Sequence, residues 1–211
     1  MSSKVKMAGR ERRQAIIEAA KELFSQRGFR GTTTRELAAA IGVSEPVLYQ
    51  HFATKRDLYT AIIDQKSKAE SEKFRALLDD ATKSNDDRAF FQRLASLIFR
   101  WHSEDPAYIR LLLYSGLEGH ELATMSYERQ AVRFFEAIAA HIRKRMEAGA
   151  FRNDIDPLDA ARAFVGMVSH FAQAIVIFHS PQYEAGNCER RLEAMIEIFL
   201  SGMQKVREAR E

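Results

Sequence analysis

Two short segments near the N-terminus carry apolar residues at helical spacing, and a single glycine separates them. In the first segment, Leu37 and Ile41 lie four residues apart, and Gly42 stands where a left-handed residue commonly ends a helix. In the second segment, Leu48 and Phe52 repeat this spacing and face back toward the first helix. Two short helices joined by a glycine-containing turn are typical of a helix-turn-helix unit, whose second helix enters the DNA major groove.

Polar residues at the expected helix starts support this pattern. Thr33 and Glu36 have the spacing of a capping box, in which each side chain bonds the backbone N–H of the other residue. Ser44 is suited to cap the second helix. Thr54 and Asp57 repeat the capping-box spacing at the start of a third, much longer helical segment. The pattern therefore predicts where each of these three helices begins.

The remainder of the chain has a helical pattern throughout, without the apolar and polar alternation that indicates strands. Residues 65–74 are very polar but lie inside one long helical segment, which is typical of a helix that bridges two bodies. We therefore expect an all-α fold of about nine helices, with a three-helix helix-turn-helix domain at residues 1–64 and a helical bundle at residues 65–211. Beyond the helix pair, the expected helices cover roughly residues 10–27, 54–81, 87–102, 106–117, 121–148, 157–179 and 188–207.

Composition places the chain among globular proteins, because 46% of its 211 residues are apolar and 29% are charged. A single cysteine, Cys188, excludes an intramolecular disulfide and fits a reducing cytoplasm. The longest apolar stretch, residues 163–178, is interrupted by Ser169, His170 and Gln173. It therefore predicts a buried helix rather than a membrane span, and we expect a cytoplasmic protein without a membrane partner.

Charge is distributed unevenly along the chain. Residues 1–66 contain 12 Lys and Arg against 7 Asp and Glu, a net charge of +5, whereas residues 67–211 contain 20 against 22, a net charge of −2. A basic module is the electrostatic footprint of phosphate binding. The positive charge therefore lies on the segment that contains the helix pair.

The N-terminal block resembles the DNA-binding domain of the tetracycline-repressor-like (TetR/AcrR-like) family of bacterial transcriptional regulators over roughly residues 10–63. The resemblance rests on a first helix that ends in F-x-x-x-G-F, a T-T-x-x-x-L-A helix, and the motifs G-V-S, L-Y-x-H-F and T-K-x-x-L. It implies a homodimer that binds double-stranded DNA through the helix pair. The alternative is an all-α domain whose helix pair only packs.

Helical periodicity separates the inward and outward sides of the second helix. Leu48 points inward, which leaves Gln50 outward, where its amide can pair with adenine. Glu45 can accept from cytosine N4, or it can simply place its charge at a helix N-terminus. Arg35 can reach a guanine edge or a phosphate, and the alternative role of Tyr49 is packing between helices. The resemblance implies base-reading residues Glu45, Pro46, Val47 and Gln50, and phosphate-contacting residues Thr33, Thr34, Tyr49, His51 and Lys55.

One such DNA-binding head carries few base-reading residues, so specificity requires two heads on a palindromic operator, about 34–36 Å apart. This requirement predicts a homodimer. The last two long helices each carry an apolar face wide enough for half of a four-helix bundle, although both faces could instead serve the core of a single chain. The residues expected at the dimer interface are Phe171, Ile175, Leu192, Met195, Ile196, Phe199 and Met203.

The C-terminal half contains more large apolar side chains than a small bundle requires for its core. Ligand sites are mostly apolar pockets with a few polar anchors, so we expect a site there for a small, largely apolar effector. For each polar candidate the alternative is a satisfied core or surface group. The candidate ligand-binding residues are Phe91, Phe99, His102, Tyr108, Arg110, Phe134, Met167 and His170.

Catalytic motifs are not found in the sequence. The six histidines match no metal-binding spacing, Cys188 has no evident base partner, and no glycine-rich phosphate loop is present. We therefore predict neither an enzyme, nor a metal site, nor a cofactor. The expected function is a ligand-responsive transcriptional regulator, most often a repressor in such families, and the alternative is a constitutive DNA-binding protein without an effector.

Overall fold

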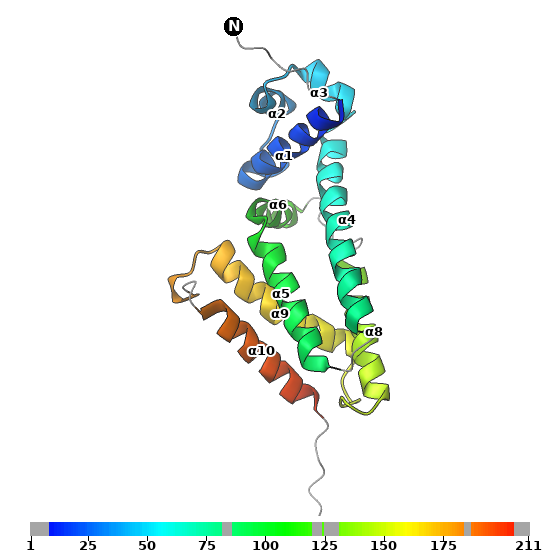
Figure 1. The fold of residues 1–211 in the computed structure, drawn as a ribbon. Helices are drawn as coiled ribbons and strands as arrows, with labels where there is room; N and C mark the ends of the chain where they lie inside the picture. The colour runs from blue at the N-terminus through cyan, green and yellow to red at the C-terminus, as the bar shows by residue number, and fades with distance from the viewer. Residues whose placement is uncertain (1–8, 82–85, 120–123, 125–130, 184–186, 205–211) are drawn as a thin grey trace, which may run out of the picture. The chain divides into compact units, whose positions relative to one another are not determined.

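Helices make up most of the protein in the computed structural model (Figure 1), which describes residues 9–81, 86–119, 124, 131–183 and 187–204. Contacts between residues divide the chain into two compact units. Unit 1 combines residues 1–69 with 107–126, and unit 2 combines residues 70–106 with 127–211. The helical content of both units confirms the expected all-α fold.

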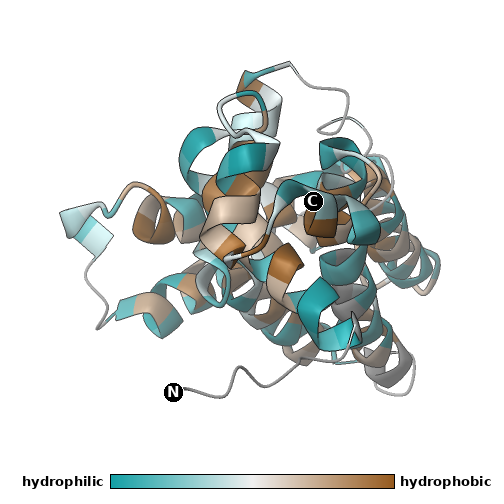
Figure 2. Cartoon of the chain, turned by 90° about the horizontal axis from the view of Figure 1, so that it is seen from above, coloured by the Kyte–Doolittle hydropathy of each residue, from teal (hydrophilic) through white to brown (hydrophobic). Residues whose placement is uncertain are grey.

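The helices of unit 1 bury their apolar sides. Figure 2 shows that hydrophilic and hydrophobic residues occur on the same helices. Its helices are α1 (Gly9–Arg27), α2 (Thr34–Ile41), α3 (Glu45–His51), the first part of α4 (Lys55–Ala81) and α6 (Pro106–Leu117). Its buried residues include Ile16, Phe24, Leu37, Leu48, Phe52, Leu58, Tyr59 and Tyr108. The inward orientation that periodicity predicts for Leu48 and Phe52 is confirmed, with 3% and 4% of each residue exposed.

The start and end of α2 follow the local chemistry predicted from the sequence. The Thr33 hydroxyl accepts the Glu36 N–H at 3.2 Å, and the Glu36 carboxylate accepts the Thr33 N–H at 2.8 Å, which completes the capping box. Gly42 ends the helix with a left-handed φ of 72°. At the start of α4, Thr54 and Asp57 form the same pair of bonds. These three predictions are confirmed.

The predicted side-chain cap at Ser44 is wrong. Ser44 has the extended dihedral angles of an N-cap residue, but its hydroxyl makes no capping bond to α3. A capping hydroxyl accepts from the second or third helical N–H. The second helical residue is Pro46, which has no N–H, and the third, Val47, donates to the Ser44 carbonyl oxygen at 3.0 Å. No donor is left for the hydroxyl.

α4 is one continuous helix through the polar segment, as expected from the sequence. The division between the two compact units falls within this helix, between Ala69 and Glu70. The division differs in one respect from a simple N-terminal and C-terminal split, since α6 belongs to unit 1 although it comes from the middle of the chain. The functional boundary at residue 64 stays a prediction.

Unit 2 is a helical bundle in which α9 packs against α5, α8 and α10. Asp86 and Asp156 cap α5 and α9 through their side chains, as expected for Asp before a helix start. The remaining residues expected in helices, 121–123, 125–130 and 205–207, lie outside the described part of the chain. Among the described helices, none has the length and apolar character needed to cross a bilayer. The elements are the rest of α4, α5 (Asp87–Ser103), α8 (Val132–Glu147), α9 (Pro157–Val176), the 3-10 turn η2 (Pro181–Tyr183) and α10 (Cys188–Met203).

Candidate nucleic-acid interface

One side of α3 is open to solvent while the other packs into unit 1. Pro46, Tyr49 and Gln50 are exposed, and Tyr49 has 47% of its surface accessible although it is a large aromatic residue. Glu45, Val47 and His51 are half-buried at the edges of this side. Within the described residues, the Tyr49 hydroxyl and the Gln50 amide make no hydrogen bond, so both remain available to an external partner.

The N-terminus of α2 lies next to α3 in the fold and presents unsatisfied backbone donors. The capping box uses the N–H groups of Thr33 and Glu36, and the Thr33 hydroxyl also donates to the Glu36 carboxylate at 2.8 Å. Within the described residues, the N–H groups of Thr34 and Arg35 have no acceptor. Free N–H groups at a helix start favour an anion such as phosphate.

The capping box is held in its charged form. Hydrogen bonds from Thr33, first from its backbone N–H, lower the pKa of Glu36, and the Arg27 guanidinium at 2.7 Å acts in the same direction. Because the Thr33 hydroxyl is already bonded to this carboxylate, the free backbone groups beside it are better placed to receive a phosphate than the hydroxyl is.

The side chains of Glu45 and Thr34 are hydrogen-bonded to each other. The Thr34 hydroxyl donates to the Glu45 carboxylate at 2.9 Å, which links the first turn of α2 to the first turn of α3. Both residues are expected to contact DNA, and in this conformation their polar groups are joined instead. The bond fixes the two helix starts relative to each other.

The ammonium of Lys55, for which the resemblance implies a phosphate contact, is bound by backbone acceptors in this structure. Its ammonium donates to the carbonyl oxygens of Phe29 and Thr32, both at 2.8 Å, and lies 4.2 Å from the centre of the Phe29 ring. Burial lowers the pKa of Lys55, and the negative charge of Glu118 opposes this shift. Two backbone acceptors hold the ammonium, so Lys55 supports the turn between α1 and α2.

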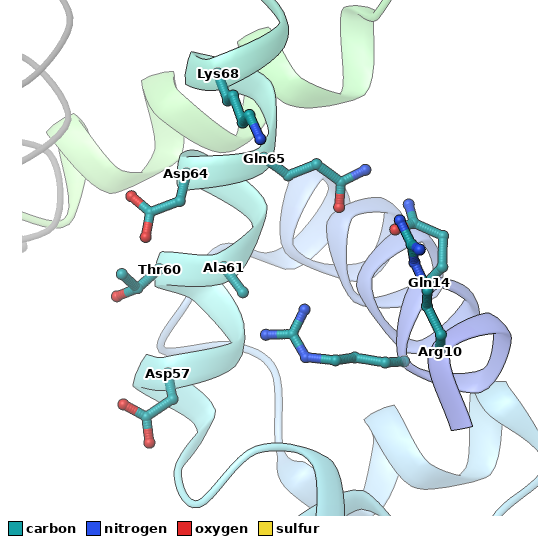
Figure 3. Close-up of a pocket in the computed structure, with 9 residues that line it drawn as sticks. Arg10, Gln14, Asp57, Thr60, Ala61, Asp64, Gln65 and Lys68 are labelled. Atoms are coloured by element: carbon teal, nitrogen blue, oxygen red, sulfur yellow. The ribbon is translucent and has the colours of Figure 1, made fainter. Parts of the chain in front are cut away.

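An open groove of about 680 Å³ runs between the start of α1 and the first half of α4 (Figure 3). Arg10 and Gln14 project from α1, while Asp57 and Asp64 belong to α4 (Figure 3). The groove therefore mixes both signs of charge. It contains none of the residues that the sequence singles out for DNA binding.

Comparisons with known proteins agree with this geometry. Residues 16–62 match the bacterial regulatory proteins of the tetR family, and residues 89–202 match the C-terminal domain of AefR-like transcriptional repressors. The chain belongs to the TetR family. It is a DNA-binding transcriptional regulator, and this class consists of regulators rather than enzymes.

Individual proteins are similar to this chain over most of its length. The nucleoid occlusion factor SlmA of Marinobacter nauticus is 28% identical over 162 residues, which cover 77% of this chain and 80% of that protein. The ketosteroid regulator KstR2 of Mycobacterium tuberculosis has the same fold, with a TM-score of 0.68, 19% identity and coverage of 97% and 99%. AibR, solved with isovaleryl coenzyme A and operator DNA, has a TM-score of 0.68, 20% identity and coverage of 89% and 97%.

The candidate ligand residues of this TetR-family chain are distributed over both units. Tyr108 and Arg110 lie on α6 in unit 1, whereas the other six lie in unit 2. Phe91 is fully buried and packs on Phe164 and Phe199 with ring centres 4.8 and 4.7 Å apart. The remaining apolar candidates are half-buried, namely Phe99, Phe134 and Met167.

The two candidate ligand-binding histidines differ in burial. His170 lies on the exposed side of α9. His102 is 1% exposed, its Nδ1 lies 2.9 Å from the Ile98 carbonyl oxygen, and its Nε2 is buried without a hydrogen-bond partner in the described residues. Burial lowers the pKa of His102, so the ring is neutral with its proton on Nδ1. Nε2 is then an unused acceptor.

Four of the seven residues expected at the dimer interface are already buried within a single chain. Phe171, Ile196, Phe199 and Met203 are each between 2% and 7% exposed, so they belong to the core, and their part in a dimer stays a prediction. Ile175, Leu192 and Met195 are half-buried. The outward side of α9 and α10 carries exposed small and apolar residues, namely Ala163, Gly166, Ala194, Ile198 and Gly202.

Metal binding has no support in the described part of the chain. No three His, Cys, Asp or Glu side chains gather there closely enough to hold a metal ion.

Proposed function

We propose that this chain is a homodimeric, ligand-responsive transcriptional repressor that binds a palindromic operator and is released by a small, largely apolar effector. The observation that carries the DNA-binding part is the open side of α3, where Tyr49 and Gln50 have no partner in the described residues. The free N–H groups of Thr34 and Arg35 at the start of α2 supply the matching phosphate site.

In this proposal α3 enters the major groove. Gln50 reads an adenine through its amide, and Val47 and Pro46 contact a thymine methyl. Tyr49 and His51 donate to phosphate oxygens, and Arg35 reaches either a phosphate or a guanine edge. These roles follow from the side-chain chemistry and from exposure on one side of the helix.

Two copies of the chain pair through α9 and α10. Small residues such as Gly166 and Gly202 allow two helices to approach closely, and Ile198 supplies an exposed apolar side chain. Four helices, two from each copy, form a bundle related by two-fold symmetry. The symmetry of this dimer matches the symmetry of a palindromic operator.

The effector binds in the C-terminal half, where His102 offers one buried acceptor among apolar side chains. A ligand hydroxyl or amide N–H that donates to Nε2 would satisfy an atom that is otherwise unpaired. Two proteins of the same fold support a ligand with an apolar part, since KstR2 is named for ketosteroids and AibR was solved with isovaleryl coenzyme A, whose isovaleryl group is apolar.

A DNA-binding factor without an effector is the second candidate. The rings of Phe91, Phe164 and Phe199 fill the core by packing on each other rather than lining a cavity. The similarity to SlmA, a nucleoid occlusion factor, favours a role beyond the control of one promoter.

Titration of DNA against ligand separates the two candidates. Duplexes selected from a random pool by the full-length protein provide the DNA, and fluorescence anisotropy measures affinity at several salt concentrations. Phosphate contacts require a steep loss of affinity with salt. A true effector weakens DNA binding by the same factor by which the duplex weakens effector binding. If ketosteroids, acyl coenzyme A esters and fatty acids all leave DNA affinity unchanged, the factor without an effector is the better description.

A further inference from the structure

Glu118, the first residue after α6, contacts the backbone between α1 and α2. Its Oε2 accepts the Phe29 N–H at 3.2 Å, and its two oxygens accept the Arg30 N–H at 3.2 and 3.3 Å. The two partners lie 89 and 88 residues before Glu118 in the chain. A charged acceptor on two backbone N–H groups is among the stronger hydrogen-bond arrangements in proteins.

The same turn is held by a positive charge from α4. As described above, the Lys55 ammonium takes the Phe29 and Thr32 carbonyl oxygens, so Phe29 is fixed through its N–H by Glu118 and through its C=O by Lys55. The Thr32 hydroxyl, which is fully buried, donates to the Gly28 carbonyl oxygen at 2.8 Å and closes the turn. The turn therefore depends on opposite charges from two other helices.

Close packing makes this contact specific. Gly28 has a left-handed φ of +73°, and a Cβ at this position would lie 2.1 Å from the Glu118 Oε1 and 3.4 Å from the Tyr114 ring. A second contact from the same helix is the Leu111 carbonyl oxygen, which accepts the Tyr59 hydroxyl at 3.2 Å. α6 is therefore docked on the DNA-binding helices at more than one point.

We propose that Glu118 is a positioning residue for DNA binding, through which α6 sets the turn that leads directly into the phosphate-binding start of α2. The turn ends at Thr33, whose neighbours Thr34 and Arg35 carry the free N–H groups. A shift of the turn moves these donors together with the α2 and α3 starts that the Thr34–Glu45 bond joins. This inference rests on the proposed DNA-binding function of that site.

The direction in which DNA affinity changes when the Glu118 carboxylate is removed distinguishes a positioning role from a purely electrostatic one. Removal of one negative charge from a DNA-binding protein, by itself, strengthens binding to the polyanion. Loss of a positioning carboxylate weakens it. Glu104 provides the matched control, because it is an exposed carboxylate just before α6 that pairs with the Lys73 ammonium at 3.3 Å.

The experiment compares full-length wild type with Glu118→Ala, Glu118→Gln, Glu104→Ala and Glu104→Gln, on duplexes that wild type has selected from a random pool. We expect Glu118→Ala to raise the dissociation constant about tenfold, the scale of one lost charge-assisted hydrogen bond. Glu118→Gln, which keeps one acceptor, has a smaller effect in the same direction. Both Glu104 variants bind as well as wild type or slightly tighter.

Two further readouts separate positioning from a loss of fold. If a phosphate contact at the α2 start is lost, the slope of log affinity against log salt becomes shallower by about 0.9 in the Glu118→Ala variant. Amide exchange at Phe29 and Arg30 accelerates while far-UV circular dichroism and dimer mass stay unchanged. Should the alanine variant not fold, the glutamine variant, which preserves the side-chain shape, decides the question.

Each outcome has a defined meaning. Weakened binding with a shallower salt slope supports the inference. Glu118 variants that bind like the Glu104 variants, or tighter, overturn it and leave the proposed function intact. Failure of wild type to bind any duplex refutes the proposed function, and the role of Glu118 in DNA binding with it.

Discussion

Ile198→Asp tests the proposed dimer at a large apolar side chain that α10 leaves exposed in a single chain. Ile198 lies on the outward side of α10 and is 66% exposed in a single chain. The neighbouring core residues Ile196 and Phe199 are 2% and 7% exposed, so the substitution changes the surface without opening the core. If two copies pair through α9 and α10, both copies of Ile198 become buried.

The magnitude follows from this exposure. Full burial of an isoleucine side chain stabilises by about 1.5–3 kcal/mol, so burying the exposed two thirds contributes about 1–2 kcal/mol per copy. Two symmetry-related copies contribute about 2–4 kcal/mol, which converts to about 30- to 1,000-fold in the dimer dissociation constant. Aspartate adds the cost of burying two like charges at one interface, so this range is a lower bound.

Sedimentation equilibrium over a concentration series measures the dissociation constant. Val132→Asp is the matched control, since Val132 is also apolar and exposed in unit 2 but lies at the start of α8. We expect the control to dimerise like wild type. An Ile198→Asp protein that keeps the wild-type dissociation constant refutes pairing through this side of α10.

Three other predictions concern the DNA-binding head and pH. Gln50→Ala should cost about 1–3 kcal/mol on the selected duplex and relax the preference at one base, as seen by repeating the selection. Thr33→Ala removes the cap of α2 and should lower the free energy of unfolding by about 1 kcal/mol in urea titrations. Burial lowers the pKa of His102 and His141 from 6.5, so stability is complete above that pH and declines as the pH falls through the lowered values. The urea midpoint of His141→Gln should then depend less on pH between 7 and 5 than that of wild type. An equal pH dependence would contradict a lowered pKa of His141 in the folded protein.

Local chemistry made the DNA-binding head predictable. The capping box joins Thr33 and Glu36, which are three residues apart, and Gly42 ends the same helix a few residues later. Such features depend on near neighbours only, so the sequence is sufficient to recognise them. The inward orientation of Leu48 likewise follows from the helical repeat alone.

Side chains with several reachable partners were less predictable. Lys55 sits beside the DNA-binding helices and carries a positive charge. From the sequence alone, a contact with phosphate and a contact with backbone carbonyl oxygens fit this charge equally well. The fold brings two carbonyl oxygens within 2.8 Å of its ammonium, and these take the charge instead. The Ser44 hydroxyl lost its expected role for a related reason, because the backbone of α3 had already used the available N–H.

By itself, the sequence determined the helices, their ends and which side of each is apolar, since these depend on residues within one or two turns. Only the tertiary structure decided what covers each apolar side and which distant groups meet. Phe199 and Ile198 are adjacent on α10, and only the packing of α5 and α9 places the first in the core and leaves the second outside. The contact of Glu118 with Phe29 spans 89 residues and has no local signal, because it arises from the docking of α6 rather than from any pattern along the chain.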